Sequence, residues 1–449
     1  MVIPAKYNAQ AKSIMLVDKM THRFRHNLMQ MHKSLLNTSF KRTKFNILSL
    51  SWQRGKRINW HHQLVKSLFP LLILISFVAV LWGNSFTPVT AQTPRQEIRG
   101  VWITNNDLNI FKDRQKVQDS VKKLRQLNFN TLYPVVWNSG YVMYPSVVAK
   151  RLDIQPFVFR GSDGHDILAD VIDKAHRQNL LVVPWFEFGF MAPPTSELAL
   201  NKPEWFTQKR NGSQTSISAA GEVMWLNPFH PEVQQFITNL LLELANNYDI
   251  DGIQFDDHMS LPHEFGYDKY TVALYRQETK KNPPADAQDP EWVSWRANKI
   301  TDFMVRLNER VKQIKPKAIF SVSPNYYDFA YKFQLQDWLN WVRLNIVDEL
   351  IVQVYRENQD QFNAKISRPE MQEVQQIIPT GVGIMAGLRT KPVSMRQIKS
   401  QVRAAQQRGL GVVFFYYESL WNNSSEPLNE RLTGFKSLFP YPALRLAAD

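Results

Sequence analysis

One short segment, residues 248–258, gathers side chains that could do acid–base chemistry. It reads Tyr-Asp-Ile-Asp-Gly-Ile-Gln-Phe-Asp-Asp-His and ends in two adjacent carboxyls and an imidazole. Polar and apolar residues alternate in its centre, as in a strand, so Gln254 and Asp256 share one face and the apolar residues the other. With the apolar face packed on helices, Asp256 points inward at the end of a strand and Asp257 begins the following loop.

The same alternation predicts further polar and aromatic side chains at the ends of other strands. Carboxylates, amides that bind hydroxyls and flat aromatic faces are together what a sugar-binding site requires. We therefore predict that a set of residues joins Gln254 in binding substrate at one end of the fold. One of these residues, His258, belongs to the segment above. The others are Asn105, Trp137, Trp185, Asn325, Gln353, Tyr355, Tyr416 and Glu418.

Hydrolysis of a glycosidic bond needs one protonated carboxyl and one ionised carboxylate. We predict Glu187 and Asp256 as this pair, with Asp257 as a neighbouring charge that tunes or replaces one of them. Burial beside Trp185 would raise the pKa of Glu187, which is the direction that a general acid requires. The alternative is that the two aspartates only cap the turn after the strand.

Two other kinds of protein remain open. Asp256 and Asp257 with His258 and His263 resemble a short metal-binding cluster, which would suit a metal-dependent polysaccharide deacetylase. In those deacetylases the histidines come well downstream of the acids, whereas here they follow immediately. This spacing argues against a metal site, so we expect neither a metal nor another cofactor. A non-catalytic glycan-binding barrel is the second alternative, but binding alone does not need converging acids.

The elements that must position these residues alternate between short apolar runs and amphipathic stretches. This pattern predicts an α/β fold, a (β/α)8 TIM barrel, over residues 92–449. A doubly wound open sheet is the alternative, and no glycine-rich phosphate loop supports it. Strands are predicted at Arg99–Ile103, Thr131–Val136, Leu181–Phe186, Gly252–Asp256, Ile319–Ser323, Leu350–Tyr355, Ile377–Ile384 and Gly411–Tyr416. Helices are predicted at Val117–Leu127, Asp166–Gln178, Pro231–Asn246 and Ser394–Arg408.

Three long insertions each follow a predicted strand, at Asn138–Gly164, Met191–Phe229 and Ser260–Trp292. The loops that follow the strands of a TIM barrel form its active face. The extra chain length is therefore expected at the same end of the barrel as the carboxyls.

The net charge of +14 does not indicate a nucleic-acid partner. Residues 1–67 hold 13 of the basic residues and one acidic residue, so this leader accounts for most of the charge and is predicted to be disordered. Residues 92–449 are nearly neutral, with 41 basic and 39 acidic residues. A basic tail says nothing about a basic groove, and we expect a polysaccharide partner instead.

An uncharged apolar run, residues 68–82, follows the leader and is succeeded by small residues up to Ala91. Its length is typical of a signal peptide, although an uncleaved signal anchor is the alternative for residues 68–91. Either reading predicts an exported domain that contacts a membrane only through this segment. The chain has no cysteine, which excludes disulfides and thiol nucleophiles.

From Glu97 to about Trp421 the chain resembles the bacterial family-10-like glycosyl hydrolases, a group that includes enzymes acting on denuded peptidoglycan strands. The resemblance implies a TIM barrel and hydrolysis of a cell-envelope glycan, with peptidoglycan strands as the leading substrate. At position 258 this chain has His, whereas the family commonly has Tyr there. The matching stretches are EIRGVWIT at 97–104, MYPS at 143–146, Ala175-His176, WLNPFHPEV at 225–233, YDIDGIQFDDH at 248–258, Trp295-Arg296, SVSPN at 321–325 and QVY at 353–355.

Overall fold

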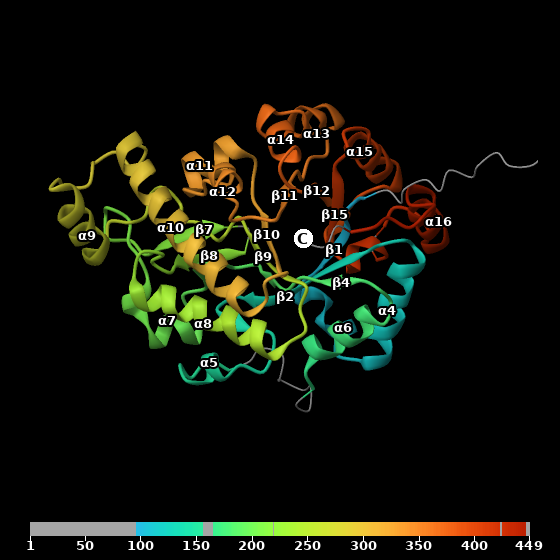
Figure 1. The fold of residues 1–449 in the computed structure, drawn as a ribbon, viewed down its shortest axis with the longest axis horizontal. Coiled ribbons are helices and arrows are strands. Elements are labelled where there is room, and N and C mark those ends of the chain that lie inside the picture. The colour runs from blue at the N-terminus through green and yellow to red at the C-terminus, as the bar shows by residue number, and fades with distance from the viewer. Residues whose placement is uncertain (1–95, 156–164, 219, 423, 446–449) are drawn as a thin grey trace, which may run out of the picture. The chain divides into compact units, whose positions relative to one another are not determined.

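The structure, a computed structural model, describes residues 96–445 apart from 156–164, 219 and 423. Eight parallel strand positions close into a barrel, because the first strand pairs with both the second and the last. The TIM barrel predicted from the sequence is confirmed (Figure 1). The strands are β1 (Arg99–Ile103), β2 (Thr131–Asn138), β4 (Leu181–Val182) with β5 (Trp185–Phe186), β9 (Gly252–Asp256), β10 (Ile319–Ser323), β11 (Glu349–Gln353), β12 (Thr380–Met385) and β15 (Gly411–Phe415).

Six predicted strands agree with those observed to within two residues at each end, and two differ more. The third is interrupted between β4 and β5 at Pro184, which has no N–H to donate to a neighbouring strand. The predicted strand Ile377–Ile384 begins only at Thr380. Ile377 and Ile378 instead donate their backbone N–H groups to the carbonyl of Val374, so they close the preceding helix.

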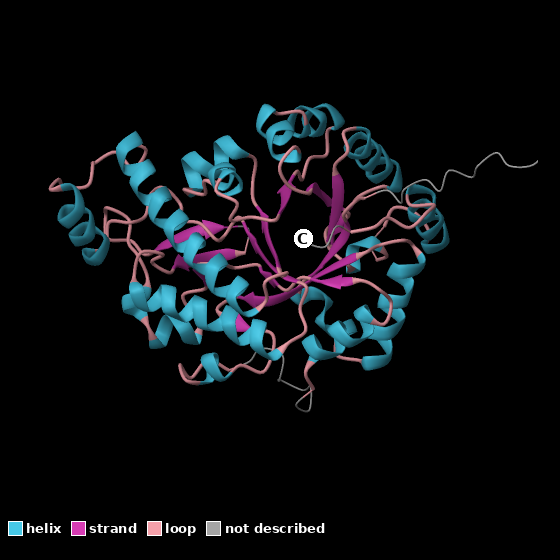
Figure 2. Ribbon diagram, viewed as in Figure 1, coloured by secondary structure: helices cyan, strands magenta, loops and turns pink. Residues whose placement is uncertain are grey.

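Helices surround the strands (Figure 2). All four predicted helices are confirmed within three residues at each end, and a polar side chain caps the N-terminus of each, that of α8 being His230. Asp113, Asp166 and Ser394 each accept hydrogen bonds from the first turn that follows them. The longer helices are α4 (Arg114–Gln126), α6 (Ile167–His176), α8 (Pro231–Asn247), α9 (Lys269–Thr279), α10 (Pro290–Ile314), α11 (Tyr327–Gln334), α13 (Gln359–Ile366), α15 (Met395–Gln407) and α16 (Leu428–Leu438).

The long insertions carry structure of their own. The one after β5 forms a three-stranded antiparallel sheet from β6 (Met191–Ala192), β7 (Thr215–Ser218) and β8 (Gly221–Trp225). The insertion after β9 is held by Arg296, which is fully buried. Its guanidinium donates to four backbone carbonyls, those of His263, Phe265, Ala287 and Trp292. Both insertions therefore have ordered structure, and both follow the carboxyl ends of barrel strands.

A chain of hydrogen bonds runs through the barrel interior. Trp102 Nε1 donates to Gln254 Oε1 at 2.6 Å, and Gln254 Nε2 donates to Ser321 Oγ at 2.9 Å. Ser321 Oγ donates to Glu349 Oε1 at 2.8 Å, and Glu349 also pairs with Arg445. The side chains of Gln254 and Ser321 thus have hydrogen-bond partners in the interior, as burial favours, whereas Arg445 Nε and Nη2 have none among the described residues.

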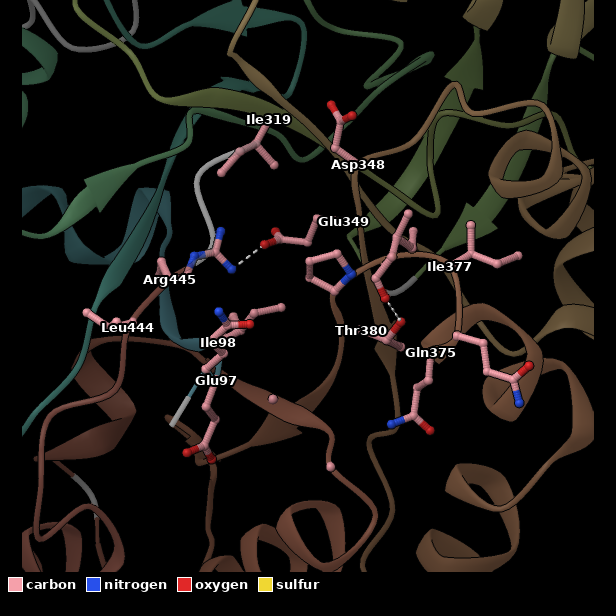
Figure 3. A pocket seen from close by; sticks show the side chains of 16 residues that line it. Glu97, Ile98, Ile319, Asp348, Glu349, Gln375, Ile377, Thr380, Leu444 and Arg445 are labelled. Carbon is pink, nitrogen blue, oxygen red and sulfur yellow. Dashed lines mark hydrogen bonds and ion pairs between the residues drawn. The ribbon is translucent and has the colours of Figure 1, made fainter. Parts of the chain in front are cut away.

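The amino end of the barrel has a hollow of about 560 Å³, which Figure 3 shows from close by. Its lining includes the first residues of several strands, among them Ile319, Glu349 and Thr380. In TIM barrels this end serves stability, whereas chemistry is placed at the carboxyl ends of the strands. The hollow therefore lies at the opposite end of the barrel from the predicted carboxyls.

The leader (1–67) and the segment predicted as a signal peptide or anchor (68–91) lie outside the described residues. Within the part of the chain that the structure describes, no helix is both long enough and apolar enough to cross a membrane.

The buried ion pair of Glu349 and Arg445, at the amino end of the barrel, gives a prediction about stability. We expect Glu349→Ala to lower the free energy of unfolding by about 3–5 kcal/mol, because it leaves Arg445 buried without its partner. Denaturant unfolding measures this loss. Glu373→Ala is the control, since it removes an exposed pair with Arg343 and should cost at most about 1 kcal/mol. Equal losses in both variants would contradict the interior role of Glu349.

Candidate active site

Three carboxyls meet where two neighbouring strands end. Glu187 directly follows β5, Asp256 is the last residue of β9, and Asp257 is the next residue. The strands β5 and β9 pair in parallel, so these ends lie side by side. His258 joins them, because its Nδ1 lies 2.7 Å from the carbonyl oxygen of Glu187 and 3.2 Å from Asp256 Oδ1. Glu187 and the two aspartates therefore lie together at the ends of β5 and β9, as the sequence predicts.

The carboxylate of Asp257 is held by three amide groups. Gln353 Nε2 donates to Oδ1 at 3.0 Å, and Asn325 Nδ2 donates to Oδ2 at 2.8 Å. Gln334, at the end of α11, donates more weakly to Oδ2 at 3.3 Å. An ionised carboxylate only accepts hydrogen bonds, so three donors fit that form and fix its orientation. Its side chain is 15% exposed, against 3% for Asp256.

Glu187 has the electrostatic setting of a proton donor. Burial raises its pKa to about 8, and the negative charge of Asp256 adds to this rise. Asn138 Nδ2 donates to Glu187 Oε2 and acts in the opposite direction. At neutral pH this carboxyl therefore carries a proton, which agrees with the direction predicted from its place beside Trp185.

Asp256 and His258 form a coupled pair. Burial raises the pKa of Asp256 to about 7, while the imidazolium of His258 opposes that rise. For His258, burial favours the neutral ring, but the charges of Asp256 and Asp257 outweigh it and raise the pKa to about 10. The imidazole is thus protonated at neutral pH. It is a fixed cation between the two strand ends.

Four aromatic rings lie close to the carboxyls. Trp102, Trp185, Tyr355 and Phe415 form a contiguous group with ring centroids 5.5–6.4 Å apart. Tyr355 and Phe415 are half-buried, whereas the two tryptophans are buried. Burial and the nearby negative charges raise the pKa of Tyr355, the charge of Asp257 first among them. The site therefore combines an acidic rim with an aromatic floor.

The loops after β1 and β15 form another part of the rim. Asn105 begins a short helical turn after β1, and Tyr416 lies 3.4 Å from Glu418 through its hydroxyl. Glu418 pairs with Arg389, and its backbone N–H donates to Asp107 at 2.8 Å. Burial raises the pKa of Asp107 to about 7. The predicted residues Tyr416 and Glu418 are thus tied to this rim by their neighbours.

Two predicted substrate-binding residues lie away from the rim. Gln254 is fully buried in the interior chain of hydrogen bonds. Trp137 is also fully buried, where its ring packs on Phe236 of α8 and its N–H donates to the carbonyl of Gly189. This geometry favours a positioning role for both over contact with a sugar.

Sequence reasoning missed several residues of the site. Asn138, Asp107 and Gln334 touch or face its carboxyls, and Phe415 completes the aromatic floor. Asn138 continues β2 past its predicted end, so extending the strand by two residues could have found it. Gln334 comes from the end of a helix, and strand alternation gives no signal for it.

The alternative of a metal site rests on Asp256, Asp257 and His258, whose ligand atoms lie within 4.8 Å of one another. The imidazole nitrogen that faces both carboxylates is Nδ1. It lies 2.7 Å from a carbonyl oxygen that can only accept, so it carries a proton and has no lone pair for a metal. These residues in this arrangement do not fit a divalent ion.

A TIM barrel with several carboxyls over aromatic rings at the ends of its strands has the architecture of a glycoside hydrolase. Comparison with known families agrees with this class. The family described as glycosyl hydrolase-like 10 matches residues 97–405, and the chain belongs to that family. The family resemblance found in the sequence is therefore confirmed.

Characterised relatives carry the same class in their names. The glycosyl hydrolase DigH of Escherichia coli strain K12 is 26% identical over 314 residues, which cover 61% of this chain and 69% of the relative. The glycosyl hydrolase YngK of Bacillus subtilis is 22% identical over 251 residues, covering 52% of this chain and 46% of YngK.

Solved structures share the fold at low sequence identity. The glycoside hydrolase domain of PgaB (BpsB) from Bordetella bronchiseptica matches with a TM-score of 0.56 at 15% identity, covering 72% of this chain and 94% of that domain. The catalytic domain of the β-amylase from Paenibacillus polymyxa matches with a TM-score of 0.52 at 11% identity, covering 77% and 99% respectively. Both similarities support the barrel.

The raised pKa of His258 gives a prediction about pH. A group whose pKa is raised on folding contributes stability that is complete below its unfolded pKa of about 6.5 and is lost as the pH rises through about 10. We therefore expect His258→Gln to destabilise the fold most below pH 6.5, and the difference from the wild type to shrink toward pH 10. Unfolding free energies measured across this range test it.

His263→Gln is the matched control for that series, because His263 lies in the same loop and makes only neutral hydrogen bonds. A loss of stability in His258→Gln that does not change with pH would contradict an ionic interaction between the His258 imidazolium and Asp256.

Proposed function

We propose that this protein hydrolyses glycosidic bonds in a cell-envelope polysaccharide. The observation that carries the proposal is the pairing of unlike carboxyls: Glu187, whose pKa is raised to about 8, lies on the strand next to the amide-held Asp257. Such an environment separates a protonated acid from an ionised carboxylate, as glycoside hydrolysis requires. Membership of a glycosyl hydrolase-like family supports the same reaction class.

In the proposed mechanism Glu187 gives its proton to the oxygen that leaves the broken bond. Asp257 is the ionised partner, as nucleophile or as base for water, because its side chain is the more exposed of the two aspartates. Asp256 holds His258 and adds negative charge that keeps Glu187 protonated. Relative to the pair predicted from the sequence, Asp257 takes the role first given to Asp256.

We propose peptidoglycan glycan strands as the substrate, with the barrel acting outside the cytoplasm. The apolar segment 68–91, with its small residues before position 92, supports export. The aromatic floor supports a pyranose ring, because a ring of this type presents an apolar face.

Substitution of the three carboxyls tests the assignment on glycan strands freed of stem peptides, with products analysed by mass. We expect Glu187→Gln and Asp257→Asn each to lower kcat by about 10²–10⁴-fold, because each removes a group that acts in the chemical step. Asp256→Asn should lower activity less and shift the pH profile, since it changes the charge beside Glu187.

Asp249→Asn is the control, because this acid belongs to the same segment and its side chain is 85% exposed. The assignment is wrong if Glu187→Gln and Asp257→Asn both keep wild-type rates on a substrate that the wild type cleaves.

The same reaction tests the alternative of a metal-dependent deacetylase, which the closeness of three potential ligand atoms raises and the protonated Nδ1 of His258 argues against. We expect EDTA to leave activity unchanged and no acetate to be released, because His258 Nδ1 is protonated toward Glu187. New reducing ends and free acetate are measured in the same reaction. Acetate release that EDTA abolishes would favour the deacetylase.

A further inference from the structure

A pair of cations lies at the rim of the site, beyond β10 and β11. Lys365 belongs to α13, and its Nζ lies 3.4 Å from the ring centroid of Tyr326. Tyr326 directly follows Asn325, which holds Asp257. The ammonium group thus rests on an aromatic face next to the residue that orients the ionised carboxylate.

The second cation is Arg356, which directly follows Tyr355 of the aromatic floor. Its Nη1 donates to the carbonyl of Tyr355 at 2.9 Å, so the guanidinium folds back toward the strand end. Gln401 Nε2 donates to the Arg356 carbonyl at 2.6 Å and fixes the backbone there. Both cations therefore extend from positions adjacent to residues of the site.

Neither cation has a carboxylate partner among the residues that the structure describes. Arg368, the third cation nearby, pairs with Asp328 and Glu370, which occupies those two acids. Partial burial lowers the pKa of Lys365, and the charges of Arg368 and Arg356 lower it further. Among the described residues, Lys365 and Arg356 thus carry two positive charges that are not in ion pairs.

We propose that Lys365 and Arg356 bind a carboxylate carried by a sugar of the glycan chain, one sugar removed from the ring that is cleaved. A guanidinium and an ammonium are the side chains that bind a carboxylate through charge-assisted hydrogen bonds. Tyr326 holds the ammonium of Lys365 next to Asn325, which donates to Asp257. The inference rests on the proposed function and adds which side chains of this protein bind the carboxylate of its substrate.

The positions of the carboxyls and of the two cations predict where along the glycan a carboxylate is bound. Glu187, Asp256 and Asp257 repel an anion at the ends of β5 and β9, whereas Arg356 follows β11 and Lys365 lies on Tyr326, which follows β10. A carboxylate is thus excluded from the cleaved position and favoured beside it. In a strand with acidic and neutral sugars in alternation, this arrangement would set which bond lies over the carboxyls.

Binding and cleavage of matched glycans test the site. The probes are peptide-free peptidoglycan strands with free lactyl carboxylates, the same strands with these carboxylates converted to methylamides, and hyaluronan oligosaccharides, in which the carboxylate is a uronate. Calorimetry with Glu187→Gln protein measures affinity without turnover. We expect the methylamide strands to bind about 10-fold more weakly than the carboxylate strands.

Lys365→Gln combined with Arg356→Gln should abolish this preference and leave the affinity for the methylamide strands unchanged. Lys332→Gln is the matched control, because it removes an exposed positive charge from the neighbouring helix α11. Thermal unfolding of each variant establishes that it is folded. Tighter binding of hyaluronan than of the lactyl strands would assign the carboxylate to a uronate.

Equal affinity of Glu187→Gln protein for the carboxylate and methylamide strands would overturn the inference, as would a preference that survives the double substitution. Failure of the proposed function gives a different result. In that case wild-type protein would cleave no strand, while the binding preference would still be measurable.

Discussion

The charged bridge through His258 is the interaction on which the site depends. Its ring is held between the carbonyl of Glu187 and the carboxylate of Asp256, so one imidazolium ties the ends of two neighbouring strands together. The same cation compensates part of the negative charge that three buried or half-buried carboxyls would otherwise share. Without it, no nearby positive charge would oppose the rise that burial causes in the pKa values of Asp256 and Glu187.

The barrel supplies the precision that this bridge requires. Parallel pairing fixes Asp256 beside Ser323 and puts Gln254 beside Trp185, so the strand ends are placed by register. Below them, the interior chain from Trp102 to Glu349 fixes the floor against rotation. The loops then contribute amides and cations to a frame that is already rigid.

Much of this was predictable from the sequence, for physical reasons. Strand alternation placed Glu187 and Asp256 on inward faces, and eight apolar runs predicted the barrel. The alternation of faces does not say how deep in the barrel a side chain lies, so it predicts Gln254 as a substrate-binding residue, whereas Gln254 lies in the barrel interior. It also gave no information on Gln334, which reaches Asp257 from a helix far along the chain, because such contacts are set by tertiary packing.

The central claim is that a glycan lies across Glu187 and Asp257, and one measurement tests it directly. A crystal structure of Asp257→Asn protein with a bound peptidoglycan oligosaccharide should place a glycosidic oxygen within about 3 Å of the Glu187 carboxyl. The ring on one side of that oxygen should lie over Tyr355 and Phe415. An oligosaccharide bound elsewhere, or with every glycosidic oxygen out of reach of Glu187, would contradict the account.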